Sequence, residues 1–410
     1  MGIVVQKFGG SSVADAECIK RVAKRVGETF KDGHKVVVVV SAMGDTTDYL
    51  LDLAGKITDN PPKRELDMLL ATGEQQSIAL LSMALDKLGY SAVSLTGQQA
   101  GIFTNQVHAK SKILWINCER LEEELTQNHI VIVAGFQGVT ERNEITTLGR
   151  GGSDTSAVAL AAALKADVCE IFTDVDGVYT ADPRIVPDAR KLETISYDEM
   201  LELASLGALV LQPRSVEVAK QFGVKIHVRS SFNHNPGTIV QEVREMKQQM
   251  EKEIVVSGVA SDLNVVKFTI FDIPDKPGTA SKLFRALADD MINVDMIIQS
   301  QQRDDINDIS FTVTRDDREK TKEVIAKIKD IIGGRNYSYE NNVAKVSVVG
   351  AGMITNPGVA ARMFETLAEN DINIEMISTS EIKVSCIIKA EFAQKAVAAL
   401  HSAFELGENK

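Results

Sequence analysis

The last third of the chain contains an internal repeat without gaps. Residues 275–300 match residues 355–380 at a constant offset of 80 positions. The matched positions combine a Pro-Gly step with regularly spaced apolar residues: Pro277/Pro357, Gly278/Gly358, Phe284/Phe364, Leu287/Leu367, Asn293/Asn373, Met296/Met376 and Ser300/Ser380. Agreement of this length at one fixed period indicates two copies of one folding module.

Each copy is expected to form strand, helix, strand, strand and helix. The first copy has these patterns at Val265–Ile273, Gly278–Asp289, Val294–Ser300, Ile306–Thr314 and Lys320–Ile331, and Tyr337–Asn341 can close it. This predicts a ferredoxin-like βαββαβ module at 264–342 and a second one at 343–410. The second copy has no closing strand after its last helix. We therefore expect the strand at 254–260, which precedes both copies, to complete the second module.

The first 240 residues alternate short apolar strands with helical patterns. Expected strands are Ile3–Lys7, Val36–Val40, Ala92–Leu95, Ile130–Val139, Asp167–Phe172 and Lys225–Ser230. The strand at 225–230 is expected to be the last one of this domain. Expected helices are Ala14–Phe30, Asp67–Leu88 and Ala157–Leu164, and Pro187–Gly223 is mainly helical. The pattern predicts an open α/β sheet whose ligands bind at the carboxyl ends of its strands. The charged segment 241–253 then connects this domain, 1–240, to the repeat.

A glycine-rich loop, Thr146–Ala157, joins one of these strands to a helix. Gly149, Gly151 and Gly152 allow a sharp turn and close approach to a ligand, and Ser153 and Asp154 are good N-caps. A helix N-terminus favours anions, and Arg150 adds a planar fork suited to a carboxylate. The alternative is an ordinary strand-to-helix turn with Arg150 as a solvated charge.

Three other loops follow strands or interrupt helices. Lys7 beside Gly9 and Gly10 is a candidate phosphate clamp, or else a strand-end lysine facing solvent, and no GxxxxGK[ST] sequence occurs. Glu74 is either a surface helix residue or a polar group turned toward a ligand amine. In the acidic turn Thr173–Arg184, a calcium loop is rejected because the acidic ligand expected after the glycine is missing. Tyr179, Asp182 and Arg184 could hold a nucleotide there, with a solvated turn as the alternative.

Composition limits the classes of function. The apolar share of 44% and charged share of 25% are those of a globular protein. A net charge of -12 without a basic cluster argues against a nucleic-acid partner. The sequence shows no signal peptide and no apolar run long enough for a membrane span. Its four cysteines have neither metal-ligand nor disulfide spacing, which predicts a cytoplasmic protein without a metal site of its own.

Taken together, the loops and the repeat resemble the aspartate kinase (aspartokinase) family over essentially the whole chain. This family belongs to the amino-acid kinase superfamily and carries two C-terminal ACT domains. The motifs that carry the resemblance are Lys7–Gly10, Ser41–Gly44, Thr72–Glu74, Gly149–Asp154 and Thr173–Tyr179. Two departures are Ser11, where relatives commonly have threonine, and the less acidic turn Ser231–Asn235.

The resemblance implies an α/β fold, a carbamate kinase-like three-layer sandwich followed by two ACT modules. It implies phosphoryl transfer from MgATP to the side-chain carboxylate of L-aspartate, giving 4-phospho-L-aspartate, the first step of lysine, threonine and methionine biosynthesis. A carboxylate is already ionised at pH 7 and needs no general base. This agrees with the position of all six histidines outside the motifs. The magnesium would be held mainly by the nucleotide phosphates.

The resemblance also implies roles for individual residues. Lys7 and Asp174 would be catalytic. The nucleotide would contact Lys7, Phe8, Gly9, Gly10, Thr173, Asp174, Tyr179, Asp182 and Arg184. The substrate aspartate would contact Ser41, Thr47, Glu74, Arg150, Gly151, Gly152 and Ser153.

Regulation is expected at the ACT pair, through lysine, threonine or both. Candidate effector residues are Asp275, Gly278, Ala280, Gln299, Met353, Asn373, Ile374, Thr379 and Glu381. A homodimer or higher oligomer through the ACT modules is expected, and a regulatory subunit could start at Met246 or Met250. Two rival functions are another amino-acid kinase, acting on glutamate, N-acetylglutamate or carbamate, and a catalytically silent amino-acid sensor.

Overall fold

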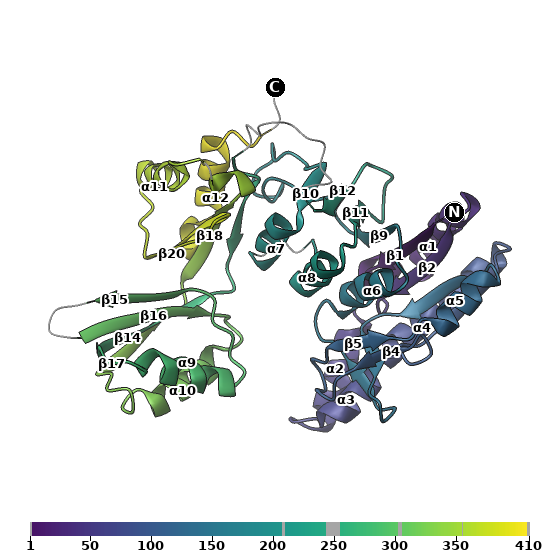
Figure 1. The fold of residues 1–410 in the computed structure, drawn as a ribbon, viewed down its shortest axis with the longest axis horizontal. Helices are drawn as coiled ribbons and strands as arrows, with labels where there is room; N and C mark the ends of the chain where they lie inside the picture. Colours follow the sequence, from purple (N-terminus) through teal and green to yellow (C-terminus); the bar gives the residue numbers. More distant parts are fainter. Residues whose placement is uncertain (1, 207–209, 243–254, 302–305, 355, 408–410) are drawn as a thin grey trace. The chain divides into compact units, whose positions relative to one another are not determined.

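The computed structural model describes residues 2–206, 210–242, 255–301, 306–354 and 356–407, and its contacts divide them into two compact units (Figure 1). The first unit takes in the described residues of Met1–Val178, Lys191–Ser205 and Leu209–Gln249. The second takes in those of Tyr179–Arg190, Leu206–Ala208 and Met250–Lys410. The predicted connector lies outside the described residues from residue 243 onward, as do Met246 and Met250.

An eight-stranded sheet forms the centre of the first unit, in the order β10-β12-β11-β9-β1-β2-β6-β3. Its strands are β1 (Ile3–Phe8), β2 (Lys35–Val40), β3 (Ala92–Leu95), β6 (Ile130–Ala134), β9 (Val168–Thr173), β10 (Thr194–Ser196), β11 (Ile226–Ser230) and β12 (Thr238–Gln241). All neighbours are parallel except β11 and β12. β11 is therefore not the last strand of this domain, because β12 follows it in the chain and pairs with it in the antiparallel direction.

Helices cover both faces of this sheet. On one face, α1 (Ala16–Lys31) and α4 (Thr72–Lys87) pack against Val36, Val38 and Val40 of β2. On the other, α6 (Gly152–Ala163) contacts β1, β2 and β9, and α8 (Pro213–Phe222) packs on α6. The β2 valines are fully buried, as expected of a strand covered on both sides. The three-layer fold predicted from the sequence is confirmed.

A smaller sheet, β5-β4-β7-β8, lies beside the main one in the same unit. Its strands are β4 (Ile102–Thr104), β5 (Ile113–Ile116), β7 (Gln137–Val139) and β8 (Ile145–Thr147). The first unit also contains the helices α2 (Thr46–Ile57), α3 (Lys63–Leu70), α5 (Glu119–Thr126) and α7 (Tyr197–Ser205). The apolar run 130–139, expected as one strand, is divided between the two sheets because Phe136 has a φ of 66°. The helix expected over 67–88 is α3 and α4, and the Ala71 carbonyl between them accepts a hydrogen bond from the Gln137 side chain.

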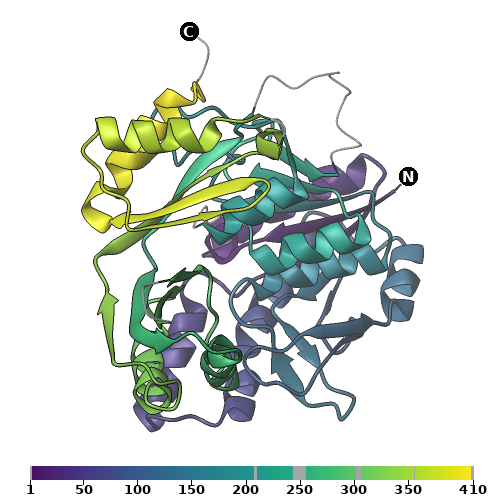
Figure 2. The ribbon, with the colours of Figure 1, turned by 60° about the vertical axis from the view of Figure 1, so that its left-hand side comes forward.

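The second unit contains the two repeat modules. The first has the sheet β15-β16-β14-β17 and the second β13-β18-β20-β19. Their elements are β14 (Val266–Pro274), α9 (Thr279–Asp289), β15 (Ile297–Gln301), β16 (Ile306–Val313), α10 (Arg318–Ile328) and β17 (Asn336–Glu340), then β18 (Val343–Val349), α11 (Val359–Glu369), β19 (Met376–Thr379), β20 (Lys383–Lys389) and α12 (Ala393–Ala403). Figure 2 shows α11 and α12 packed over their sheet.

Strand β13 (Gly258–Asp262) pairs antiparallel with β18, in the position that β17 takes beside β14. It thus occupies the edge of the second module, which its own segment leaves open. The strand begins four residues later than the sequence pattern 254–260 suggested, because Gly258 is the first residue in register with β18.

Reciprocal ion pairs join the two modules. Lys267 Nζ of the first lies 2.9 Å from Glu375 Oε2 of the second, and Lys345 of the second pairs with Asp295 of the first. Met296 and Met376, equivalent positions of the repeat, share an apolar cluster between these pairs. Equivalent positions of the repeat, Asp295 and Glu375 as well as Met296 and Met376, therefore all contribute to the contact between the two modules.

Residues 179–190 pack with the second unit, although the sequence groups them with the catalytic domain 1–240. Ala181, Val186 and Ala189 belong to the apolar core of the second module. The Thr180 hydroxyl lies 2.9 Å from Nε2 of the buried His401 on α12. The division by contacts therefore differs from the predicted domain 1–240 in this segment, because its apolar residues are buried in the core of the second module.

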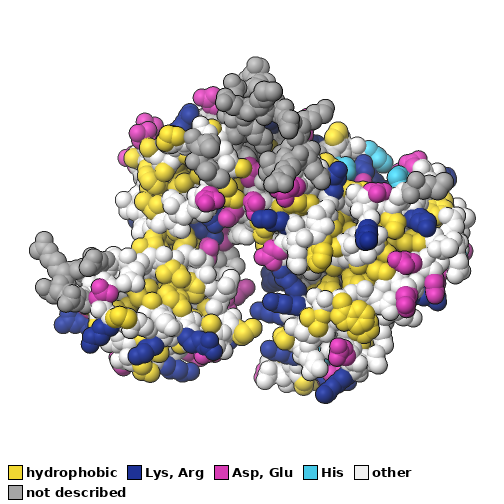
Figure 3. Space-filling view, in the orientation of Figure 1, with side chains coloured by type: hydrophobic (Ala, Val, Ile, Leu, Met, Phe, Trp, Pro, Cys, Tyr) yellow, Lys and Arg dark blue, Asp and Glu magenta, His cyan; other side chains and the backbone are white. Residues whose placement is uncertain are grey.

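None of the described helices is long and apolar enough to span a membrane. Acidic and basic side chains are distributed over both units on the face shown in Figure 3.

Candidate active site

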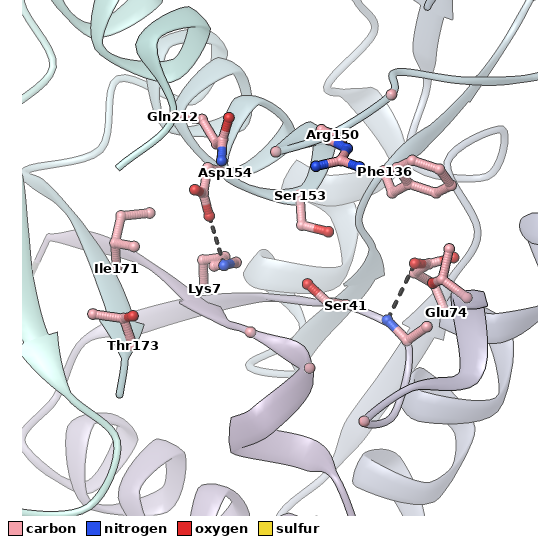
Figure 4. A pocket seen from close by; sticks show the side chains of 18 of the residues that line it. Lys7, Ser41, Glu74, Phe136, Arg150, Ser153, Asp154, Ile171, Thr173 and Gln212 are labelled. Carbon is pink, nitrogen blue, oxygen red and sulfur yellow. Dashed lines mark hydrogen bonds and ion pairs between the residues drawn. The ribbon is translucent and has the colours of Figure 1, made fainter. Parts of the chain in front are cut away.

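An open cavity of about 380 Å³ lies at the carboxyl ends of β1, β2 and β9 in the first unit (Figure 4). The starts of α4 and α6 also contribute to it. Its lining residues are Lys7, Gly9, Gly10, Ser41, Ala42, Gly44, Thr47, Glu74, Phe136, Gly149, Arg150, Gly151, Gly152, Ser153, Asp154, Ile171, Thr173, Val210 and Gln212.

Lys7 and Asp154 form an ion pair inside the cavity. The Lys7 Nζ lies 2.6 Å from Asp154 Oδ1, and the two side chains are only 12% and 10% exposed. Asp154 lies in the first turn of α6, where the helix dipole also stabilises a carboxylate. The prediction that Ser153 and Asp154 cap this helix is wrong: the N-cap is Gly151, with a φ of 69°. A Cβ on Gly151 would lie 1.9 Å from Gln212 Cγ, so glycine is required there.

Arg150 is exposed on the turn before α6. Within the described part of the chain, no carboxylate lies within ion-pair distance of its guanidinium. The amides at the start of α6 face the same cavity, and a helix start of this kind stabilises bound anions. A guanidinium and helix-start amides arranged in this way are suited to binding an anion.

Glu74, in the first turn of α4, is only 2% exposed. Its Oε1 accepts a hydrogen bond from the Ala42 amide at 3.1 Å, while Oε2 is buried without a hydrogen-bond partner among the described residues. Burial raises the pKa of this carboxyl from 4.5 to about 8. A cationic group bound in the cavity would favour the ionised form, so Glu74 is suited to an amine ligand.

The structure brings most of the predicted substrate residues together. Ser41, Thr47, Glu74 and Arg150–Ser153 all line the cavity, as do Lys7, Gly9, Gly10 and Thr173 of the predicted nucleotide set.

Five predicted nucleotide residues do not line this cavity. Phe8 is fully buried and stacks on Phe172 at 4.6 Å, because β1 is covered on both faces. Asp174 accepts a hydrogen bond from the neighbouring Thr173 hydroxyl. Tyr179, Asp182 and Arg184 belong to the second unit, where Asp182 and Arg184 form an ion pair of 2.7 Å.

Sequence reasoning missed several lining residues. Asp154 was inside the glycine-rich motif, but its charge was assigned to helix capping. Phe136, Ile171, Val210 and Gln212 come from four different segments, and no local pattern connects them with the motif.

The chain matches the amino acid kinase family over residues 2–230 and ACT domains over residues 268–333 and 346–404. It is 54% identical over 406 residues to an aspartokinase of Bacillus sp. (strain MGA3), covering 99% of this chain and 98% of that protein. The chain belongs to the aspartokinase family. Aspartokinase 2 of Bacillus subtilis (strain 168) is 53% identical over 409 residues, covering 100% of this chain and 99% of that protein.

Solved aspartokinase structures have the same fold. The chain is similar to E. coli aspartokinase III in complex with aspartate and ADP, with a TM-score of 0.84, 26% identity and coverage of 98% and 99% of the two chains. Aspartate kinase from Synechocystis is 49% identical with a TM-score of 0.55, covering 99% of this chain and 70% of that one. An aspartokinase is a kinase that transfers phosphate from ATP to a carboxyl group of aspartate, so the predicted enzyme class is confirmed.

The nine predicted effector residues all lie in the second unit of this aspartokinase. Asp275, Gln299, Asn373, Thr379 and Glu381 are exposed. Ala280 and Ile374 pack against the cores of the first and second modules, respectively. Gly278 has a φ of 91° and caps α9, and Met353 packs against the second core.

Proposed function

We propose that this aspartokinase transfers the γ-phosphoryl group of MgATP to the side-chain carboxylate of L-aspartate in the cavity described above. The product is 4-phospho-L-aspartate. One observation carries the proposal: a largely buried lysine, an arginine without an ion pair among the described residues, and a buried acid whose second oxygen has no hydrogen-bond partner among them line a single cavity. Phosphate, carboxylate and ammonium groups are the respective ligands that these side chains favour.

Aspartate would be held at both of its α-substituents. The planar guanidinium of Arg150 donates hydrogen bonds to the α-carboxylate, and Oε2 of Glu74 accepts a hydrogen bond from the α-ammonium. Ser41, Thr47 and Ser153 supply hydrogen bonds. Binding of the α-carboxylate and the α-ammonium orients the side-chain carboxylate of aspartate. Such positioning supplies much of the rate enhancement in phosphoryl transfer.

The attacking carboxylate oxygen forms a bond to the γ-phosphorus, and the bond from that phosphorus to the bridging oxygen breaks, releasing ADP. No proton moves, since the acceptor is ionised at neutral pH. Lys7 and the amides of Gly9 and Gly10 stabilise the charge on the transferring group, and Asp154 holds the Lys7 ammonium in place. Thr173, Asp174, Tyr179, Asp182 and Arg184 stay predicted nucleotide contacts.

Magnesium fits this site as a companion of the nucleotide. Among the described residues, no three His, Cys, Asp or Glu side chains are grouped so that they could hold a metal ion. Mg²⁺ is commonly bound through substrate phosphates and one or two carboxylates. We assign its ligation mainly to the nucleotide phosphates. When bound, it would reduce the charge repulsion between the phosphates.

The ACT modules would make the enzyme responsive to lysine, threonine or both, the end products of the pathway that starts with this reaction. Among the described residues, each module's sheet ends in two edge strands, β15 and β17 in the first and β13 and β19 in the second, and β15 lies beside β19 within the chain. Pairing of such edges across subunits would produce a dimer or higher oligomer. A separate regulatory subunit and a cytoplasmic location stay predictions.

An assay of acyl phosphate formation tests the proposed reaction. Hydroxylamine trapping and ADP release would be measured with L-aspartate, with L-glutamate and without acceptor. We expect hydroxamate only with aspartate. Preference for glutamate would favour another amino-acid kinase, and no product with any acceptor would favour an amino-acid sensor.

A further inference from the structure

A buried carboxylate outside the cavity ties two loops together. Asp67 of α3 has no exposed surface, and its oxygens accept hydrogen bonds from the Thr147 hydroxyl at 2.5 Å and the Ala109 amide at 3.1 Å. His108 Nδ1 lies 2.7 Å from the same carboxylate. Thr147 ends β8, three residues before Arg150. Asp67 therefore joins the His108 side chain and the Ala109 backbone to the strand that leads into the glycine-rich turn.

Arg214, in the first turn of α8, makes a second set of contacts to these loops. Its guanidinium donates to the Leu148 carbonyl at 2.6 Å and to the Ser111 carbonyl at 3.0 Å. Ser111 in turn donates its amide and its hydroxyl to the Thr147 carbonyl, at 3.0 Å and 2.9 Å. The backbone immediately before Gly149 is thus fixed from two sides by charged side chains.

We propose that Asp67 and Arg214 are positioning residues for the aspartate site. The proposal rests on the proposed role of Arg150, whose side chain has no ion pair of its own among the described residues. The direction in which the Arg150 side chain points is therefore set by the conformation of the backbone that carries it. Gly149 turns with a φ of 77°, and a Cβ there would lie 3.0 Å from the Ala109 carbonyl, so the loop held by Asp67 directly abuts the turn.

Three variants test this positioning: Asp67→Asn, Arg214→Lys and Arg214→Met. We expect the KM for aspartate to rise about tenfold or more, since small misplacements of a binding group are costly, with the KM for ATP within about twofold of wild type. Arg214→Lys keeps the charge but not the two-pronged contact, so its effect should be smaller than that of Arg214→Met. It also preserves the test if Arg214→Met does not fold.

Glu124→Gln is the matched control. Glu124 on α5 is also buried and lies 2.5 Å from a histidine, His129 Nδ1, but does not line the cavity. We expect this variant to lower Tm without changing the KM for aspartate. An equal KM increase in the control, or unchanged KM in all three test variants, would overturn the positioning role.

A double-mutant cycle with Arg150→Ala distinguishes the role of Arg150 as the aspartate contact from the positioning role of Arg214. If positioning acts through Arg150, Arg214→Met raises the KM for aspartate in the wild-type background but adds little in Arg150→Ala. If the KM increase in the double variant equals the product of the two single-variant increases, the positioning role is overturned while Arg150 is kept as the aspartate contact. A wild-type KM in Arg150→Ala alone would overturn the proposed role of Arg150 itself, and the positioning role with it.

Discussion

The ammonium of Lys7 lies 2.6 Å from the Asp154 carboxylate, although one residue belongs to β1 and the other to α6. Each side chain is about nine-tenths buried, and a buried charge is costly unless it is paired. Asp154 therefore allows a lysine to sit inside the cavity before any nucleotide arrives. The pair also holds the ammonium in one place, which suits a group that must meet a developing phosphoryl charge.

Lys7→Ala should reduce kcat by about 100-fold or more, since a preorganised charge is lost from the transition state. The KM for ATP should change far less. Asp154→Asn keeps the shape but removes the partner charge, so it should lower kcat by a smaller factor. Steady-state ADP release measures both variants, and near-normal kcat in Lys7→Ala would contradict the role given to this lysine.

Arg150→Lys keeps the positive charge but loses the planar fork. We expect the KM for aspartate to rise by about tenfold or more, with the KM for ATP near its wild-type value. The measurement is a pair of substrate titrations with the other substrate saturating. Equal increases in both KM values would show that the turn serves the nucleotide as well.

Glu74→Gln should change how stability depends on pH. In the unfolded chain this carboxyl ionises near its ordinary pKa of 4.5, whereas in the folded protein its pKa is about 8. Between these values the folded state binds the extra proton, so the contribution of Glu74 to stability falls as pH rises from about 4.5 to about 8. The variant should gain stability relative to wild type across that window. Urea unfolding at pH 5, 6.5 and 8 tests this, and a constant difference would contradict it.

Aspartate binding should release a proton from Glu74. At pH 7 the carboxyl is mostly protonated, and a substrate ammonium at its free oxygen would favour the ionised form. Calorimetric titration of aspartate in buffers of different ionisation enthalpy would detect the release in wild type. The signal should disappear in Glu74→Gln, and its persistence there would assign the proton to another group.

Lysine, threonine or their combination should inhibit through the second unit. We expect substitution of exposed candidates, such as Asp275→Ala or Asn373→Ala, to weaken inhibition while uninhibited kcat stays near wild type. Lys165→Ala, on the loop after α6, provides a control distant in sequence from both modules. No inhibition by either amino acid at tens of millimolar would contradict feedback by these effectors.

Much of the fold could be predicted from local patterns. The five valines of β2 and the Pro-Gly repeat identified the central strand and both modules, because burial on two faces and recurrence at a fixed period leave direct marks in a sequence. Lys7 and Arg150 were placed at a strand end and in a turn because of the glycines beside them, whereas Thr47 was named only through the family resemblance. The packing of residues 179–190 with the second unit could not be predicted, since their turn-like composition does not reveal which core their apolar side chains enter.

The sequence by itself determined the central strands of the main sheet, the repeated modules and the glycine-rich turn, all of which depend on residues close together in the chain. Only the tertiary structure decided that Asp154 faces Lys7, that Glu74 is buried with one oxygen free, and that Asp67 and Arg214 hold the turn before Arg150. Each of these depends on segments that meet after folding. Pairing and desolvation between distant segments set their geometry and charge, and neither leaves a periodic signal along the chain.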